Sequence, residues 1–92
     1  MLTSTKLDLK LSKISEQLKV NPQDSLRQCN LLLSEYGHLE NVQLMLAQCQ
    51  ICCKKISLAE ITLNKIKRDF PYSVNAYVEL IYILHNKNTK KR

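Results

Sequence analysis

Glycine, proline and tryptophan are scarce or missing in this chain of 92 residues, which has one Gly, two Pro and no Trp. A shortage of Gly and Pro argues against a sheet with tight turns, a Gly-rich phosphate loop and a disordered chain. Leu, Ile, Lys, Gln and Asn are abundant instead, which is typical of helices joined by short turns. A single domain of this size buries only about 60 to 65% of its unfolded surface. We therefore expect a marginally stable helical domain that a partner stabilises.

Long apolar runs are missing too, because no stretch approaches the roughly 20 residues that a membrane span needs. The first fifteen residues carry four charges among their leucines, at Lys6, Asp8, Lys10 and Lys13. This is not the pattern of a secretory signal. We therefore expect a cytoplasmic protein that does not insert into a membrane and forms no disulfides.

The net charge of +6 is concentrated at the C-terminus. Without Lys87, Lys90, Lys91 and Arg92, the rest of the chain carries only +2. A short basic run is typical of a solvated tail, and no basic residues alternate with aromatic ones as on a nucleic-acid-binding surface. The pattern favours one domain over residues 1–86 and a polar tail over 87–92, and it gives little support to nucleic-acid binding.

Five helices are expected from apolar residues that recur every three or four positions. The first ends near Asn21 and Pro22 and has a stripe of four such residues: Leu7, Leu11, Ile14 and Leu18. We expect Gly37 to end the second helix in a left-handed backbone conformation. Together the two helices form an antiparallel hairpin.

Three more helices follow this hairpin. The third begins near Leu39 and is interrupted at residues 54–57. The fourth spans residues 58–69, with Ser57 as its N-cap and Glu60 completing a capping box. Ser73 can cap the fifth, whose apolar positions are Ala76, Tyr77, Leu80, Ile81 and Leu84.

Part of this pattern recurs with a period of about 34 residues, which is the length of a tetratricopeptide repeat. Leu46 and Leu80, for example, are one period apart. We call this period the repeat spacing. Leu46 and Ala47 are followed by Ala59, Leu63, Ile66 and Pro71, and then Tyr77, Leu80, Ile81 and Leu84 restart the order. This order of large and small residues before a proline is typical of a tetratricopeptide-type helix pair. Such pairs stack into solenoids whose inner face holds another chain.

The first unit of this repeat is less regular. A shift by the repeat spacing places Ser25, Cys29 and Leu32 where Ala59, Leu63 and Ile66 stand, but the first helix fits the shift poorly. The fold class we predict is all-α, a tetratricopeptide-like stack of antiparallel helix hairpins. The alternative is an ordinary five-helix bundle whose spacing is coincidental.

Cysteine and histidine are the residues that could carry chemistry. Cys49, Cys52 and Cys53 include a C-x-x-C, but the chain has no second such motif and no H-x-x-x-H. Because free cysteine behaves as a small hydrophobe, we interpret these three as buried structural thiols. Neither histidine has a carboxylate and a nucleophile at a spacing that would build a triad. We expect no enzyme, no metal and no cofactor.

The candidate binding site is the concave face, which the first helix of each pair lines in a tetratricopeptide stack. The groove positions of the repeat fall on the third and fifth helices, at Asn41, Leu44, Gln48, Ile51, Cys52, Asn75, Val78 and Tyr82. Apolar groups with amide and hydroxyl edges suit an amphipathic helix laid in a groove. The alternative for Leu44, Ile51 and Val78 is packing against a neighbouring helix.

The stretch from Asp24 to Leu84 resembles a known family. The run Gly37-His38-Leu39-Glu40-Asn41-Val42-Gln43-Leu44 is followed by an apolar helix, a short polar break and Ser57-Leu58-Ala59. This resembles the tetratricopeptide-like co-chaperones of type III secretion needle subunits, the YscG, PscG and EscG family. The EscG branch is nearest in length and in its Lys/Asn/Ile-rich composition.

The resemblance implies a bacterial cytoplasmic chaperone. In that family, the C-terminal helix of the needle-forming subunit lies in the groove, which prevents premature polymerisation. A small helical co-chaperone completes a heterotrimer by packing on the N-terminal region, where the candidates are Leu7, Leu11, Ile14 and Leu18. These four residues are equally consistent with plain core. A generic tetratricopeptide adaptor for a peptide or helix of another protein is the alternative function.

Overall fold

The chain is all helical. The computed structural model describes residues 2–90, and the side chains of residues 6–85. Within that range there are five helices and no strand: α1 Leu2–Gln17, α2 Pro22–Tyr36, α3 Glu40–Cys52, α4 Ile56–Asp69 and α5 Val74–Lys90. The prediction of an all-α fold is confirmed. Since α5 continues through Lys90, helix replaces most of the predicted tail over 87–92, of which residues 91–92 lie outside the described residues.

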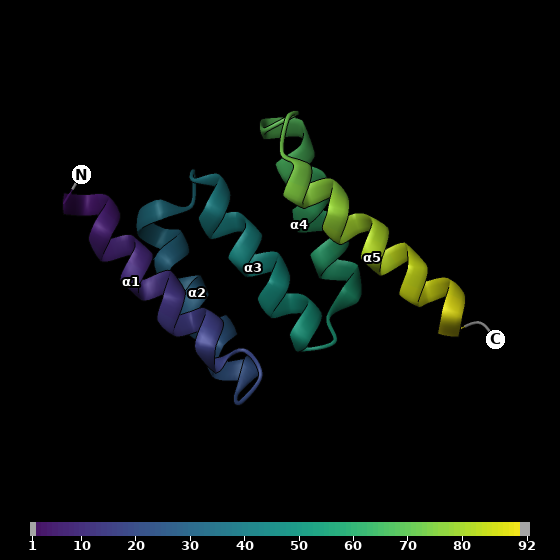
Figure 1. Cartoon of the computed structure of the whole chain (residues 1–92), viewed down its shortest axis with the longest axis horizontal. Helices are drawn as coiled ribbons and strands as arrows, with labels where there is room; N and C mark the ends of the chain where they lie inside the picture. Colours follow the sequence, from purple (N-terminus) through teal and green to yellow (C-terminus); the bar gives the residue numbers. More distant parts are fainter. Residues whose placement is uncertain (1, 91–92) are drawn as a thin grey trace.

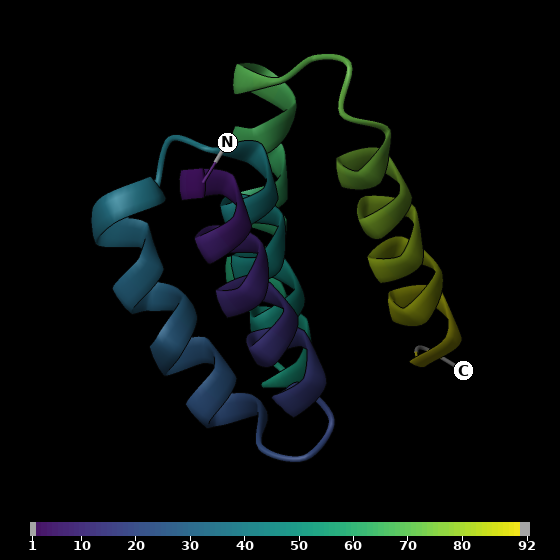
Figure 2. The same cartoon turned by 60° about the vertical axis from the view of Figure 1, so that its left-hand side comes forward.

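The helices are stacked in chain order, and each packs mainly on its neighbours in the sequence. Helices α1, α3 and α5 run in one direction on one side of the molecule, and α2 and α4 lie on the other side (Figure 1, Figure 2). The molecule measures 48 × 31 × 17 Å. Its smallest dimension corresponds to about two layers of helices packed 8 to 10 Å apart. This two-layer arrangement is compatible with a stack of helix hairpins.

The starts of the helices are separated along the chain by the same repeat spacing as the sequence pattern. Helices α2 and α4 begin at Pro22 and Ile56, and α3 and α5 begin at Glu40 and Val74. The same shift relates the buried side chains of α2 to those of α4: Ser25, Cys29 and Leu32 to Ala59, Leu63 and Ile66. Helix α1 departs from this spacing because four residues connect it to α2, whereas three connect α3 to α4.

Two apolar clusters lie on either side of α3. The first joins α1, α2 and α3 through Leu7, Leu11, Ile14, Cys29, Leu32, Val42 and Cys49. The second joins α3, α4 and α5 through Ala47, Ala59, Leu63, Ile66, Ala76 and Ile83. Helix α3 contributes to both, so it is the central element of the stack.

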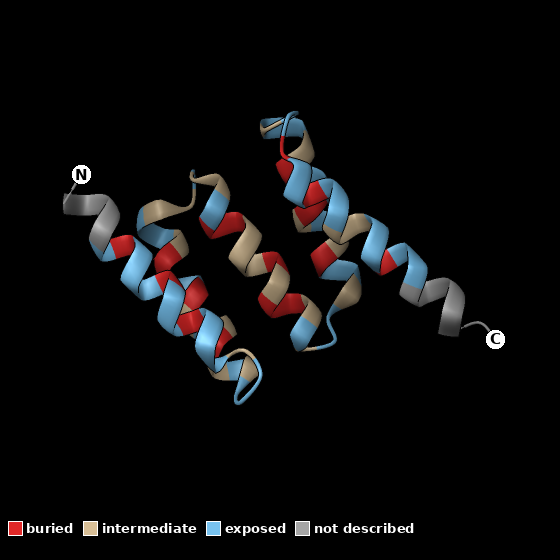
Figure 3. Ribbon diagram, in the orientation of Figure 1, coloured by how far each residue is buried: buried red, intermediate tan, exposed pale blue. Residues whose placement is uncertain are grey.

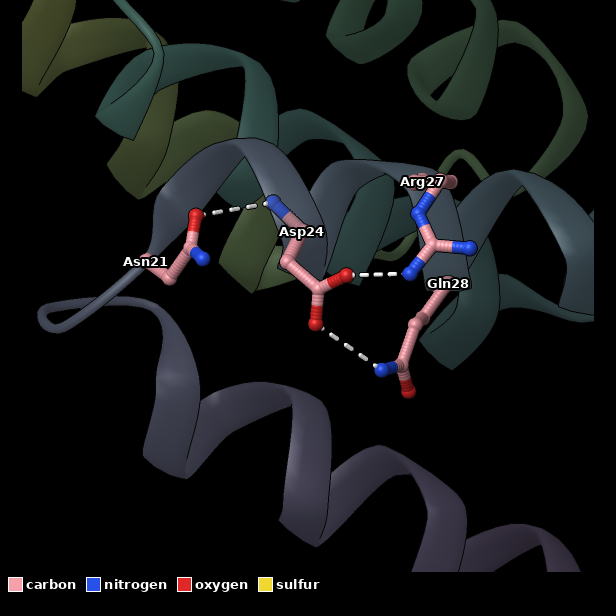
Figure 4. A network of polar contacts seen from close by, with 4 residues as sticks. All are labelled: Asn21, Asp24, Arg27 and Gln28. Atoms are coloured by element: carbon pink, nitrogen blue, oxygen red, sulfur yellow. Dashed lines mark hydrogen bonds and ion pairs between the residues drawn. The ribbon is translucent and has the colours of Figure 1, made fainter.

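Asn21 defines the start of α2. Its Oδ1 accepts a hydrogen bond from the backbone N–H of Asp24 at 3.2 Å, and Pro22 occupies the first helical turn (Figure 4). The Asp24 carboxylate in turn accepts hydrogen bonds from Arg27 and Gln28. The Arg27 hydrogen bond is the main cause that lowers the pKa of Asp24. A carboxylate that stays ionised here also interacts favourably with the helix dipole.

The left-handed backbone conformation predicted for Gly37 is wrong. Gly37 follows α2 with φ −61° and ψ −17°, which is right-handed. A Cβ at this position would lie 2.5 Å from the carbonyl oxygen of Leu33. Glycine is therefore required here by a close approach of the backbone, and not by a left-handed turn.

The left-handed turn occurs instead at Lys54, after α3, where φ is 64°. The N–H groups of Lys54 and Lys55 donate to the carbonyl oxygens of Ile51 and Gln50 at 3.0 and 2.8 Å. This pattern closes the C-terminus of α3 as a Schellman motif. Because the chain turns so tightly, α4 begins at Ile56 and has no side-chain cap, so the predicted capping box at Ser57 is wrong.

Replacing Lys54 by glycine is expected to stabilise the protein. A residue with a Cβ is strained in the left-handed conformation by about 1 kcal/mol, which glycine relieves. For a domain of this size, that corresponds to a melting temperature higher by about 4 to 8 °C in a thermal denaturation experiment. Lys54→Ala is the matched control, because it removes the same charge but keeps the strain. If both variants melt alike, the backbone is not strained at this position.

Candidate functional site

The helices α3 and α5, which carry the predicted site, are held together at their N-termini. Ser73 Oγ donates a hydrogen bond to Glu40 Oε2 and accepts one from the backbone N–H of Ala76 at 3.4 Å. Ser73 therefore caps α5, as predicted, and fixes its start beside the start of α3. Because the starts of the two helices are related by the repeat spacing, Asn41 and Asn75 occupy equivalent positions on them.

The α3/α5 face, defined by the eight predicted groove residues, combines exposed and half-buried side chains. The exposed ones are Asn41, Cys52, Asn75, Val78 and Tyr82, and the half-buried ones are Leu44, Gln48 and Ile51. Leu44 and Ile51 pack against the second apolar cluster. Packing on a neighbouring helix therefore describes these two residues, whereas Val78 is 53% exposed. The face consists of apolar residues anchored in the core and of exposed apolar and amide groups.

The prediction of buried thiols holds for only part of the cysteines. Cys29 and Cys49 are buried, Cys53 is half-buried and Cys52 is exposed. Cys52 is the last residue of α3. Within the described residues, no group of three His, Cys, Asp or Glu side chains could hold a metal ion.

The buried thiols differ from Cys52 in their surroundings. Cys29 Sγ donates to the carbonyl oxygen of Val42 at 3.7 Å. A hydrogen bond with Cys29, together with burial, strongly raises the pKa of Cys49. Partial burial also raises the pKa of Cys52, and the negative charge of Glu79 adds to this shift. The accessible thiol of the α3/α5 face is therefore a weaker acid than an ordinary cysteine.

Alkylation of Cys52 is expected to be slow and to require high pH. A raised pKa leaves less thiolate at a given pH, and the thiolate is the nucleophile. In a Cys53→Ser background, iodoacetamide should modify one thiol of the folded chain, with a pH midpoint above the value of about 8.5 for free cysteine. Mass spectrometry gives the rate, and the same chain unfolded in urea is the control. Equal midpoints in the two states would contradict the pKa shift.

The N-terminal stripe that was predicted to contact a co-chaperone is part of the core. Leu7, Leu11 and Ile14 are buried and Leu18 is half-buried, and they pack with residues of α2 and α3. The plain-core alternative is therefore the one the structure supports. These side chains cannot contact a partner unless α1 moves away.

The residues of α5 that face the core differ from those that were predicted. Ala76 is buried and Leu80 packs on the second cluster, but Tyr77, Ile81 and Leu84 are exposed. The third core residue is Ile83, which sequence reasoning missed. A shift by the repeat spacing leads from the buried Val42 and Cys49 to Ala76 and Ile83, so the repeat contained the signal.

Two buried glutamines of α3 were also missed. Gln50 Oε1 accepts a hydrogen bond from Thr62 Oγ1 of α4 at 2.8 Å. Gln43 Nε2 donates to the carbonyl oxygen of Gly37 at 2.6 Å. Both amides therefore lie at contacts of α3 that a hydrophobic pattern does not reveal.

Comparison with known proteins identifies no relative of this chain. No model of a protein family matches it, and neither a curated protein nor a solved structure does. No helix in the described part of the chain is long and apolar enough to cross a membrane.

Proposed function

We propose that this protein is a cytoplasmic chaperone of a bacterial type III secretion system, without enzymatic activity. It holds the amphipathic C-terminal helix of the needle-forming subunit on the α3/α5 face until export. The proposal combines the resemblance of residues 24–84 to the YscG, PscG and EscG family with the composition of this face. The observation that supports it is that Val78 and Tyr82 are exposed on α5 one repeat spacing after Leu44 and Gln48 of α3, where Leu44 and Ile51 pack on the second apolar cluster.

The chemistry of the α3/α5 face suits an amphipathic helix. Exposed Val78 and Tyr82 offer apolar surface to the inward side of a bound helix, and such burial contributes about 25 cal/mol per Å². Asn41 and Asn75 offer amide groups from equivalent positions of α3 and α5, where they can fix the register of the ligand. Covering an amphipathic helix in this way prevents its self-assembly.

A small helical co-chaperone would have to bind α1 and α2 from outside. The leucine stripe of α1 is buried, but Leu9 of α1 and Leu31 of α2 are exposed. Leu31 lines a surface hollow between the two helices together with Lys10, Lys13 and Glu35. We therefore place the co-chaperone on this outer surface. Because it binds the folded state only, it would stabilise the protein increasingly as its concentration rises.

The test is co-expression with a candidate needle subunit and a small helical co-chaperone, followed by size-exclusion chromatography with mass measurement. Val78→Asp places a charge on the α3/α5 face and should weaken needle-subunit binding at least about thirtyfold, or about 2 kcal/mol. The matched control is Tyr72→Asp, which places the same charge on the exposed α4–α5 connection. Val78 is preferable to Leu44, because a charge at half-buried Leu44 would also destabilise the core.

The expected result is a heterotrimer for the native chain and for Tyr72→Asp, and loss of the needle subunit alone for Val78→Asp. In the Cys53→Ser background, the bound helix should also protect Cys52 from alkylation. A folded chain that ignores both partners would contradict the chaperone proposal. If the α3/α5 face instead binds helices of unrelated proteins equally well, the protein is a general tetratricopeptide-like adaptor.

A further inference from the structure

Helix α5 exposes a second apolar surface, beside the α3/α5 face. Tyr77, Ile81 and Leu84 follow each other at i, i+4 and i+7 and form one line along the helix. Their side chains are 44%, 65% and 55% exposed. Figure 3 shows how much more of α5 than of α3 is exposed. We call these three residues the Tyr77 stripe.

The counterparts of the Tyr77 stripe on α3 are covered. A shift by the repeat spacing leads back to Gln43, Ala47 and Gln50, all of which are buried. Ala47 belongs to the cluster that includes Ala59 and Leu63 of α4, and Gln50 accepts a hydrogen bond from Thr62 of α4. These positions of the repeat are therefore buried on α3, where α4 packs, and exposed on α5. The geometry of the stack therefore suits a helix on the Tyr77 stripe.

The edge of this surface is basic. Tyr77 lines a surface hollow between α4 and α5 together with Ile61, Asn64, Lys65, Lys67 and Arg68. The lining contains three cationic side chains and no carboxylate. Lys67 Nζ lies 5.1 Å from the centre of the Tyr77 ring, where its charge interacts with the ring face. A ligand on the Tyr77 stripe would place its polar edge beside these cations.

The charge distinguishes between two possible occupants. A second copy of this chain would use the same patch from both sides, so that Lys65, Lys67 and Arg68 would approach their own copies. The net charge of +6 adds to this repulsion. An amphipathic helix with acidic residues along its edge meets the cations with opposite charge and covers the apolar stripe.

We propose that the Tyr77 stripe, with Ile61, binds a helix of another protein whose apolar side is flanked by acidic residues. The helix packs along α5 as α4 packs along α3. Where α3 has Ala47, α5 has the larger Ile81, so the ligand has a small residue at that point. The site does not depend on the ligand of the α3/α5 face, and it is independent of the proposed chaperone function.

Two helical peptides of about 18 residues, or five turns, test this proposal. They share an apolar side of alanine and leucine, are cross-linked between i and i+4 to hold the helix, and carry either glutamate or lysine on the polar side. Fluorescence anisotropy with the full chain at physiological salt gives their affinities. The glutamate peptide should bind at least about tenfold more tightly than the lysine peptide.

Substitutions separate this site from the α3/α5 face. Ile81→Asp should weaken binding of the glutamate peptide at least about tenfold, whereas Val78→Asp should leave the affinity for this peptide unchanged. Because Ile81 is largely exposed, both variants should keep their circular-dichroism melting curves. Equal binding of the two peptides, no binding, or no effect of Ile81→Asp would overturn the proposal. A native dimer in sedimentation that Ile81→Asp dissociates would instead assign the stripe to a second copy of the chain.

Discussion

Replacing Leu63 by alanine is expected to remove about 3 kcal/mol of the free energy of unfolding. Leu63 is fully buried at the centre of the cluster that joins α3, α4 and α5. The substitution removes the transfer free energy of three carbon atoms and leaves a cavity that the surrounding helices fill only in part. Small domains are stable by only about 5 to 15 kcal/mol, so this loss is a large share of the total.

A thermal denaturation experiment measures this loss as a decrease in melting temperature of about 15 °C. The matched control is Leu58→Ala, the same change on the same helix at a side chain that is 48% exposed. It should alter the free energy of unfolding by less than about 0.5 kcal/mol. Similar decreases for both variants would mean that α4 does not present Leu63 to the core.

The core of the second hairpin could be predicted from the sequence because two signals agree there. Ala59, Leu63 and Ile66 recur at i, i+4 and i+7, which defines one helix face. Ser25, Cys29 and Leu32 show the same pattern one repeat earlier, and all six side chains are buried. The end of α4 at Phe70 and the cap at Ser73 also follow from local chemistry.

The inward face of α5 could not be predicted from periodicity alone. The helix carries apolar residues on almost every side, so no single stripe stands out. Tyr77, Ile81 and Leu84 are exposed on α5. The equivalent face of α3 is covered by α4. The missing information was not in the residues themselves but in which face of the helix has a neighbour.

The N-terminal stripe illustrates the same limit for the candidate site. Leu7, Leu11 and Ile14 form a regular apolar line, which records burial without naming the surface that covers them. That surface is formed by α2 and α3. Backbone strain was equally hidden, because nothing about Lys54 in the sequence distinguishes it as the residue that turns left-handed.

Replacing Ala59 by leucine is expected to destabilise the protein by about 3 kcal/mol, because overpacking of a close contact forces the helices apart. Ala59 is fully buried, and so is Ala47 of α3 in the same cluster. Its counterpart in the first hairpin is Ser25, whose Oγ donates to the backbone oxygen of Ile14 at 3.1 Å. The helices of a hairpin thus approach each other closely at this position of the repeat, which only a small residue permits.

Thermal denaturation again measures the effect, with Ser57→Leu as the control. Ser57 lies on α4, is exposed and does not cap the helix, so a leucine there should change the free energy of unfolding by less than about 0.5 kcal/mol. Close approach at a small residue is expected where the two helices of a tetratricopeptide-type hairpin pack together. A native melting temperature for Ala59→Leu would therefore mean that α3 and α4 tolerate a large side chain between them. The repeat spacing would then describe the order of the helices but not their packing.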